Sequence, residues 1–206
     1  KLPIQPVQQL QQQSSNRCRD ILKYLNRDIR GNCGYGVFKC SARASGTMIP
    51  KRAELKKCTE TNQGLVNRGL DWKNHVIKML DRPDAWGIYY RGKTGILGFE
   101  VVGTRNQDDF PQLNFPEQIG EIVVSVSNQE SVNKLGTNLR AASLALLADE
   151  GHIFCDIAVL SGEKNKGQCV NTKRFGFRWT DKSVSKTTGC RHAMLFDGNI
   201  PSWEIL

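Results

Sequence analysis

The part of the chain best suited to binding a ligand is residues 121–139, EIVVSVSNQESVNKLGTNL. It places a predicted strand, a tight loop around residues 134–137 and then the start of a predicted helix. Amide groups in the first turn of a helix point outward and carry the positive end of the helix dipole. Such an end binds phosphate groups, and Gly136 would allow close backbone approach. The loop has neither GxxxxGK[ST] nor GxGxxG, so a nucleoside triphosphatase and a Rossmann dehydrogenase are not supported.

A second set of residues that could do chemistry is Cys33 with His152, as nucleophile and base. This chain order is that of papain-like and transglutaminase-like cysteine hydrolases. Asp156 lies about 13 Å from His152 along one predicted strand, so Asn165 would have to orient the imidazole. A cysteine hydrolase therefore stays open as an alternative. The chain has no CxxC pair, and no metal site is predicted.

The elements that must position these residues follow from hydrophobic periodicity and from turn signals. Residues 35–44 fit either a strand or a short helix. From residue 86 the order is β-β-β-α-β-α-β-β, which implies parallel pairing through a crossover helix and antiparallel hairpins at both ends. The fold class is therefore α+β (α/β), with a mixed sheet flanked by helices. Helices are predicted at 17–30, 50–58, 63–80, 136–150 and 168–174, and strands at 86–90, 96–102, 121–127, 152–160, 177–183 and 191–196.

From residue 86 to 196, about half of its length, the chain resembles the GNAT superfamily of N-acetyltransferases in the order of its elements. The family's acetyl-coenzyme A loop reads Arg/Gln-x-x-Gly-x-Gly/Ala, of which Gly136 matches. Asn165 and the pair Gly176-Phe177 resemble a recurring Asn before the family's fourth helix and a Gly-Phe after it. The strand that starts at Glu121 is similar to the lysine-acetyltransferase branch. The resemblance implies a mixed, mostly antiparallel sheet, here with an extra N-terminal helical segment.

The same resemblance implies an acetyltransferase that uses acetyl-coenzyme A (acetyl-CoA) and no metal. Glu121 would be the general base that accepts the proton of the attacking amine. The pantetheine arm would pair with an exposed strand edge, and an amide near Val126 would polarise the thioester carbonyl. Lys134 and Arg140 would add positive charge near the pyrophosphate. The cofactor-binding residues implied in this way are Ser125, Val126, Ser127, Asn133, Lys134, Leu135, Gly136, Thr137, Asn138 and Asn165.

Three positions depart from the family pattern. Asn133 replaces the first residue of the loop motif. Thr172 stands where many members have a Tyr that protonates the departing thiolate, so the general acid is unassigned. Asn138 adds a side chain where the loop usually has none. These departures keep a third hypothesis open, a non-catalytic binding module on an acetyltransferase scaffold.

Positive charge is concentrated at the start of the chain. The first 60 residues hold 12 Lys and Arg against 4 Asp and Glu, and the other 146 hold 17 against 16, so balances of +8 and +1 make up the net charge of +9. A basic segment predicts an acidic partner: nucleic acid, anionic lipid or an acidic protein face. The predicted domains are a flexible Gln-rich tail (1–16), a basic N-terminal helical segment (17–60) and an acyltransferase core (61–206).

The seven cysteines are odd in number and irregularly spaced, which indicates a reducing, cytoplasmic compartment. No apolar run approaches the roughly 18 residues that a membrane span needs. A Gln- and Ser-rich tail is also compatible with a secreted bacterial effector that is delivered into another cell. The acceptor would be an amine of a protein (a lysine or the N-terminus) or of a small molecule.

Overall fold

The computed structural model describes residues 17–41, 49–66, 69–106, 118–128, 134–152, 155–160, 172–179 and 190–195. The described strands form one seven-stranded sheet in the order β1-β2-β3-β4-β5-β7-β6. Neighbouring strands are antiparallel except β4 and β5, which are parallel. This mixed, mostly antiparallel sheet confirms the predicted fold class. The strands are β1 (Gly34–Lys39), β2 (Trp86–Gly92), β3 (Gly95–Asn106), β4 (Gln118–Ser127), β5 (Cys155–Leu160), β6 (Arg178–Trp179) and β7 (Cys190–Leu195).

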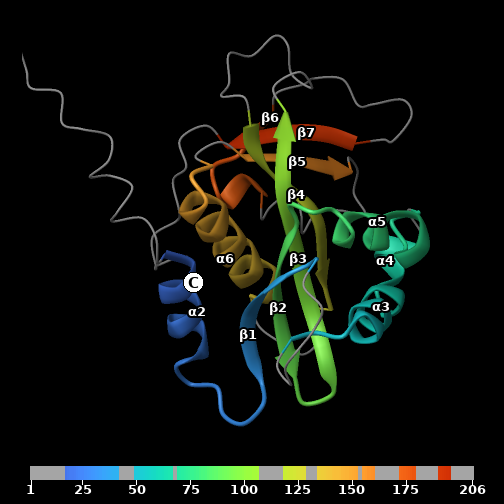
Figure 1. The fold of residues 1–206 in the computed structure, drawn as a ribbon, viewed down its shortest axis with the longest axis vertical. Helices are drawn as coiled ribbons and strands as arrows, with labels where there is room; N and C mark the ends of the chain where they lie inside the picture. Colours follow the sequence, from blue (N-terminus) through green and yellow to red (C-terminus); the bar gives the residue numbers. More distant parts are fainter. Residues whose placement is uncertain are drawn as a thin grey trace, which may run out of the picture.

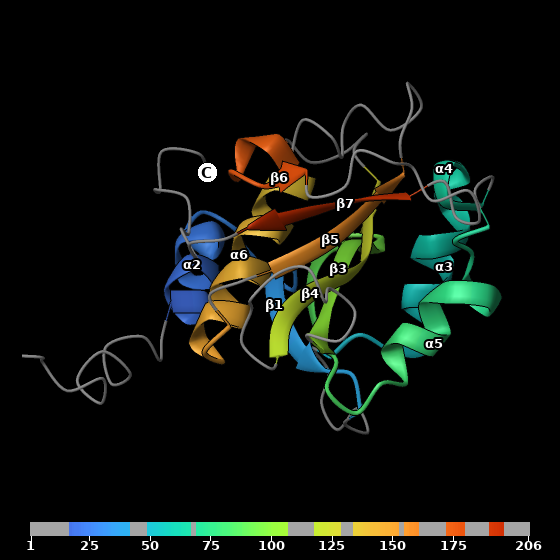
Figure 2. The same ribbon diagram turned by 90° about the horizontal axis from the view of Figure 1, so that it is seen from above.

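Helices cover both faces of the sheet (Figures 1 and 2). On one face lie α2 (Arg17–Asn26) and α6 (Leu135–Asp149), and on the other lie α3 (Arg52–Thr61), α4 (Gln63–Val66), the π-helix η1 (Trp72–Val76) and α5 (Ile77–Leu80). Of the helices that the structure describes, none has the length and apolar character needed to cross a bilayer.

The sheet separates two halves of the hydrophobic core. Alternate side chains of a strand point to opposite faces, so β3 and β4 contribute to both halves. Val102 and Ile122 pack toward α2 and α6, whereas Val101 and Val124 pack toward α3 and α5. Helix α6 approaches the sheet closely at Gly98, where an added Cβ would lie 2.9 Å from the Val126 carbonyl oxygen and 3.0 Å from the Leu135 side chain.

The basic N-terminal segment shares this core. Cys18 and Ile21 of α2 are buried in the same cluster as α6, and the Asp149 carboxylate accepts hydrogen bonds from the first two amides of α2, at 3.1 and 2.9 Å. Strand β1 pairs with β2, which resolves the choice left open for residues 35–44 in favour of a strand. The boundary between residues 60 and 61 stays a prediction, and the tail (1–16) lies outside the described residues.

The single helix predicted for residues 63–80 is wrong. The structure divides this stretch into α4, η1 and α5. Gly69 adopts a left-handed φ of 71°, which ends helical geometry, and the Asp71 side chain then caps η1 by accepting from the Asn74 amide at 2.9 Å. The spacing of the apolar residues correctly predicted that residues of this stretch pack in the core, but it could not show where the helix is interrupted.

Candidate functional site

Strands β4 and β5 stop pairing halfway along their length and diverge. Their register holds for three pairs and ends at Ile122 and Ile157, although β4 continues to Ser127 and β5 to Leu160, all within the described residues. Figure 1 shows β5 and β7 turned steeply away from β2, β3 and β4. We call the β5-facing side of β4 residues 123–127 the open edge. A divergence of this kind offers backbone groups to an extended ligand.

Alternation along β4 decides which residues face the open edge. The Asn128 amide donates to the Leu97 carbonyl at 2.9 Å, and the register continues through Ser127 opposite Gly98 and Val126 opposite Phe99. Backbone groups of alternate residues point to the same side, so those of Val126 face β3. The Val126 amide itself therefore points to β3. The prediction that an amide near Val126 polarises the thioester stays a prediction, and Ser125 and Ser127 are the neighbours that face the open edge.

The far end of the open edge contacts the helical layer. The Ser127 carbonyl accepts from the Asn62 side-chain amide at 3.3 Å, and the same amide reaches the Asn128 side chain at 3.3 Å. Asn128 in turn donates to the Thr61 hydroxyl at 3.0 Å. Hydrogen bonds thus join the end of α3 to the end of β4.

The predicted phosphate-binding turn is the first turn of α6. Lys134 precedes the helix with a left-handed φ of 58°, an uncommon conformation for a residue other than glycine, and its side chain is exposed. Leu135 is buried and anchors the turn in the core. The amides of Leu135, Gly136 and Thr137 belong to this turn and point out of the helix end.

Arg174 adds a positive charge that the sequence reasoning did not assign. Its guanidinium Nη1 donates to the Thr137 hydroxyl at 3.1 Å, so it lies at the first turn of α6. Arg174 is far from α6 in the chain, and only its place before the predicted Gly176-Phe177 turn could have drawn attention to it.

Asn138 forms hydrogen bonds within the protein. Its amide donates to the Lys134 carbonyl at 2.9 Å, as an ordinary intrahelical bond, and its side chain donates to the Tyr35 hydroxyl at 2.9 Å. The contact of Asn138 with the cofactor stays a prediction, and neither of these two hydrogen bonds supports it. The residue joins α6 to β1, and its side chain turns toward Tyr35.

Arg140 does not reach the predicted phosphate-binding turn. Its side chain is fully buried and pairs with the fully buried Glu100 of β3, at 2.8 and 2.9 Å from Oε1. The predicted role of Arg140 in neutralising the pyrophosphate is wrong, because the guanidinium points into the core.

Glu121 lies at the near end of β4 in a network of opposite charges. Its Oε2 accepts from Arg82 Nη1 at 3.0 Å, and its Oε1 lies 3.5 Å from Arg105 Nη1. Arg105 also pairs at 2.9 Å with the fully buried Asp156, the residue opposite Glu121 in β5. Arg82 follows α5, so the Glu121 carboxylate lies on the face that α3 and α5 cover.

Three predicted positions remain. Asn133 and Asn165 lie outside the described residues. Thr172 is buried, and its carbonyl accepts from the Phe177 amide at 3.3 Å around the left-handed Gly176. Thr172 therefore closes a turn, and the general acid stays unassigned.

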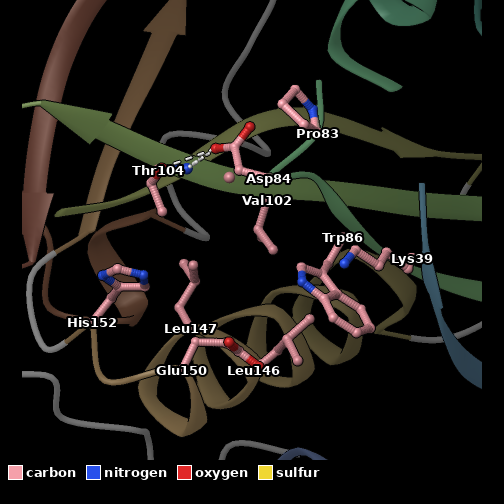
Figure 3. A pocket seen from close by; sticks show the side chains of 11 residues that line it. Lys39, Pro83, Asp84, Trp86, Val102, Thr104, Leu146, Leu147, Glu150 and His152 are labelled. Carbon is pink, nitrogen blue, oxygen red and sulfur yellow. Dashed lines mark hydrogen bonds between the residues drawn. The ribbon is translucent and has the colours of Figure 1, made fainter. Parts of the chain in front are cut away.

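The residues of the cysteine hydrolase alternative lie apart. His152 lines a pocket of about 190 Å³ with Lys39, Asp84, Trp86, Thr104 and Glu150, at the C-terminal end of α6 (Figure 3). Cys33 precedes the opposite end of β1, where Gly34 lies opposite Arg91. Six residue steps along β1, roughly 20 Å at about 3.4 Å each, separate Cys33 from Lys39, which lines the pocket. The alternative is wrong because nucleophile and base cannot meet.

Within the part of the chain that the structure describes, no three His, Cys, Asp or Glu side chains group in a way that could hold a metal ion.

Comparison with known proteins shows similarity in fold and no match in sequence. No family model matches the chain, and no curated protein matches it in sequence. Solved structures do match in shape. An acetyltransferase of the GNAT family from Streptococcus agalactiae superimposes with a TM-score of 0.52 at 12% identity, over 80% of this chain and 96% of its own.

Two further structures agree. The aminoglycoside 6'-acetyltransferase type Ii gives a TM-score of 0.52 at 12% identity, over 78% of this chain and 94% of its own. The NatC complex bound to Gag peptide and CoA gives 0.50 at 9% identity, over 80% of this chain and 98% of the matched chain. The chain therefore has the fold of GNAT acetyltransferases, as its order of elements predicted.

Proposed function

We propose that this protein is an acyltransferase that moves an acetyl group from acetyl-CoA to an amine. The observation that carries the proposal is the divergence of β4 and β5 beyond Ile122 and Ile157, next to the first turn of α6. A thioester arm fits a strand edge that leaves its neighbour, and a pyrophosphate fits a helix start. The shared fold, and the CoA bound to NatC, support the same reading.

The coenzyme would lie along two elements. Its pyrophosphate would contact the amides of Leu135, Gly136 and Thr137, with the Lys134 and Arg174 side chains supplying positive charge. Its pantetheine arm would run along the open edge, past Ser127 and then Ser125. The thioester would then reach the point where β4 and β5 converge, close to Glu121.

Glu121 is the proposed proton acceptor. An amine must be neutral to attack the thioester carbon, and it forms an amide as the carbon–sulfur bond breaks and CoA leaves as the thiol. The more loosely held oxygen of Glu121 is Oε1, at 3.5 Å from Arg105, and it would take the proton. The amine would approach from the face that α3 and α5 cover, because the carboxylate lies there.

Calorimetric titration with acetyl-CoA tests the binding part of the proposal. We expect micromolar affinity in the wild type and no measurable binding in Gly136→Glu, whose carboxylate would repel the pyrophosphate. Gln118→Glu is the matched control: it adds the same charge at the exposed start of β4 and should bind normally. Absence of wild-type binding at millimolar coenzyme would exclude the enzyme and leave the non-catalytic binding module.

Turnover tests the catalytic part. Acetyl transfer to a peptide with a free N-terminus, a lysine peptide and an aminoglycoside would be followed by mass spectrometry. With the best acceptor, Glu121→Gln should lower kcat by about 10²–10⁴-fold while leaving coenzyme affinity unchanged. The exposed Glu150→Gln is the control. An unchanged kcat in Glu121→Gln would remove Glu121 from the mechanism.

The acceptor class, a lysine, a protein N-terminus or a small molecule, belongs to the same proposal. The acidic partner for residues 17–60 stays a prediction, supported by the exposed Arg19, Lys23 and Arg30 on and after α2. The cytoplasmic location and the effector role, which rest on composition, also stay predictions.

A further inference from the structure

Val123 is the residue at which both neighbours of β4 lose register. Toward β3, Val124 lies opposite Val101 and Ile122 opposite Val102, so Val123 is the extra residue of a β-bulge. Toward β5, pairing ends at Ile122. Among the described strands, Val123 therefore has no register partner on either side, and it is the first residue of the open edge.

His75 of η1 holds this residue. Its Nε2 lies 3.0 Å from the Val123 carbonyl oxygen. A carbonyl only accepts, so Nε2 must carry a proton and donate it to this hydrogen bond. The Val123 peptide group, which pairs with neither neighbouring strand, is therefore held by a hydrogen bond from the helical layer.

The helix that carries His75 is itself fixed. The His75 amide donates to the Asp71 carbonyl at 3.1 Å, and the Asp71 side chain caps the same turn. The adjacent Val76 is 1% exposed in the core. Short π-helices are often found at functional sites, and this one projects a single donor at the bulge.

We propose that His75 is a positioning residue that fixes the Val123 peptide so that the acetyl group of acetyl-CoA is held at the converging end of the open edge. The inference rests on the proposed function. From Ser127 to Val123 the strand covers four residues, roughly 13 Å, so an arm that starts at the first turn of α6 brings its thioester to Val123. A peptide group without a strand partner can rotate unless a side chain holds it. Loss of the His75 hydrogen bond should therefore weaken contacts with the acetyl group and leave contacts with the rest of the coenzyme unchanged.

Two variants separate this role from simple packing. His75→Phe keeps an aromatic ring but removes the donor. His75→Gln changes the shape but keeps an N–H donor in place of Nε2. Calorimetry with acetyl-CoA and with CoA, on each folded variant, gives the two affinities whose ratio matters.

In His75→Phe the affinity for acetyl-CoA should fall about 5- to 10-fold more than the affinity for CoA, the size of one hydrogen bond. His75→Gln should keep the wild-type ratio. The inference is overturned if His75→Phe lowers both affinities equally or changes neither, while the proposed function then stands. If the wild type binds neither compound, the proposed function fails first. Thermal unfolding of both variants controls for a general loss of stability.

Discussion

Arg140 and Glu100 form a fully buried ion pair between α6 and β3. Moving both charges out of water is costly, and their mutual attraction offsets much of that cost only while both are present. Arg140 lies five residues after the start of α6. The pair therefore fixes how the first turn of α6 lies over the sheet, which is the turn proposed to bind phosphate.

The pair predicts strong coupling. Arg140→Met leaves the Glu100 carboxylate buried without its counter-ion and should lower the free energy of unfolding by about 3–5 kcal/mol. The double variant Glu100→Leu/Arg140→Met should recover most of this loss. Urea denaturation of the two single variants and the double variant provides the cycle. A loss below about 1 kcal/mol in Arg140→Met would contradict a buried charged pair.

Arg174 gives a second residue-scale prediction. Because its guanidinium lies at the Thr137 hydroxyl, Arg174→Ala should raise the Kd for CoA about tenfold through loss of a charge-assisted contact with phosphate. Lys173→Ala removes the same charge one residue earlier and is the matched control. The effect should shrink as salt is added. Equal effects of the two variants would show that net charge alone matters.

At the scale of elements, Asp84 ties the turn before β2 to β3. Its Oδ2 accepts from the Thr104 amide at 2.7 Å and the Thr104 hydroxyl at 2.9 Å, and it pairs with Arg82 (Figure 3). Burial alone would raise the pKa of this carboxyl, but the hydrogen bonds from Arg82 and Thr104 outweigh it and bring the pKa to about 2. The same Arg82 holds Glu121, so this turn supports the candidate site.

The lowered pKa sets the direction of a pH effect. The unfolded carboxyl titrates near 3.8, so Asp84 stabilises the fold fully above that pH, and the contribution is lost as the pH falls toward about 2. Denaturation midpoints of wild type and Asp84→Asn should differ most at pH 6 and converge by pH 2. A difference that is the same at both pH values would contradict the assignment.

The sequence predicted most elements and the helix start that is proposed to bind phosphate, since periodicity and turn residues are local signals. It could not show that Val126 faces β3 or that β4 bulges at Val123, because register depends on the neighbouring strands. The contacts of His75, Arg174 and Arg140 join residues distant in the chain, and a single sequence carries no sign of them. Asn138, which departs from the loop pattern, hydrogen-bonds to Tyr35 of β1.

At the scale of the whole molecule, the sheet divides the proposed work. In the proposal, the coenzyme would approach the open edge from the α6 end. The Glu121 carboxylate lies on the opposite face, which α3, η1 and α5 cover, and His75 contacts β4 from that helical layer. The N-terminal α2 packs on α6 in the same core, with Cys18 and Cys155 in one buried cluster. The described part of residues 17–60 should therefore unfold together with the rest.

Thiol labelling tests this cooperativity. Burial raises the pKa of Cys18, Cys40 and Cys58 to about 12 and that of Cys155 well above its usual range, so these thiols should react slowly in the native state. Among the five cysteines whose side chains the structure describes, the half-buried Cys33 should react first. In a urea series read by mass spectrometry, Cys18 and Cys155 should become reactive at the same concentration. Earlier labelling of Cys18 would show that residues 17–60 form a separate unit.

In the proposed complex, the coenzyme occupies the open edge and the first turn of α6. Amide hydrogen exchange, with and without acetyl-CoA, measures this directly. We expect added protection in peptides that cover residues 123–127 and 134–137, none in β1, and no change in Gly136→Glu. Exchange at residues 123–127 that acetyl-CoA leaves unaltered at saturating concentration would contradict the account.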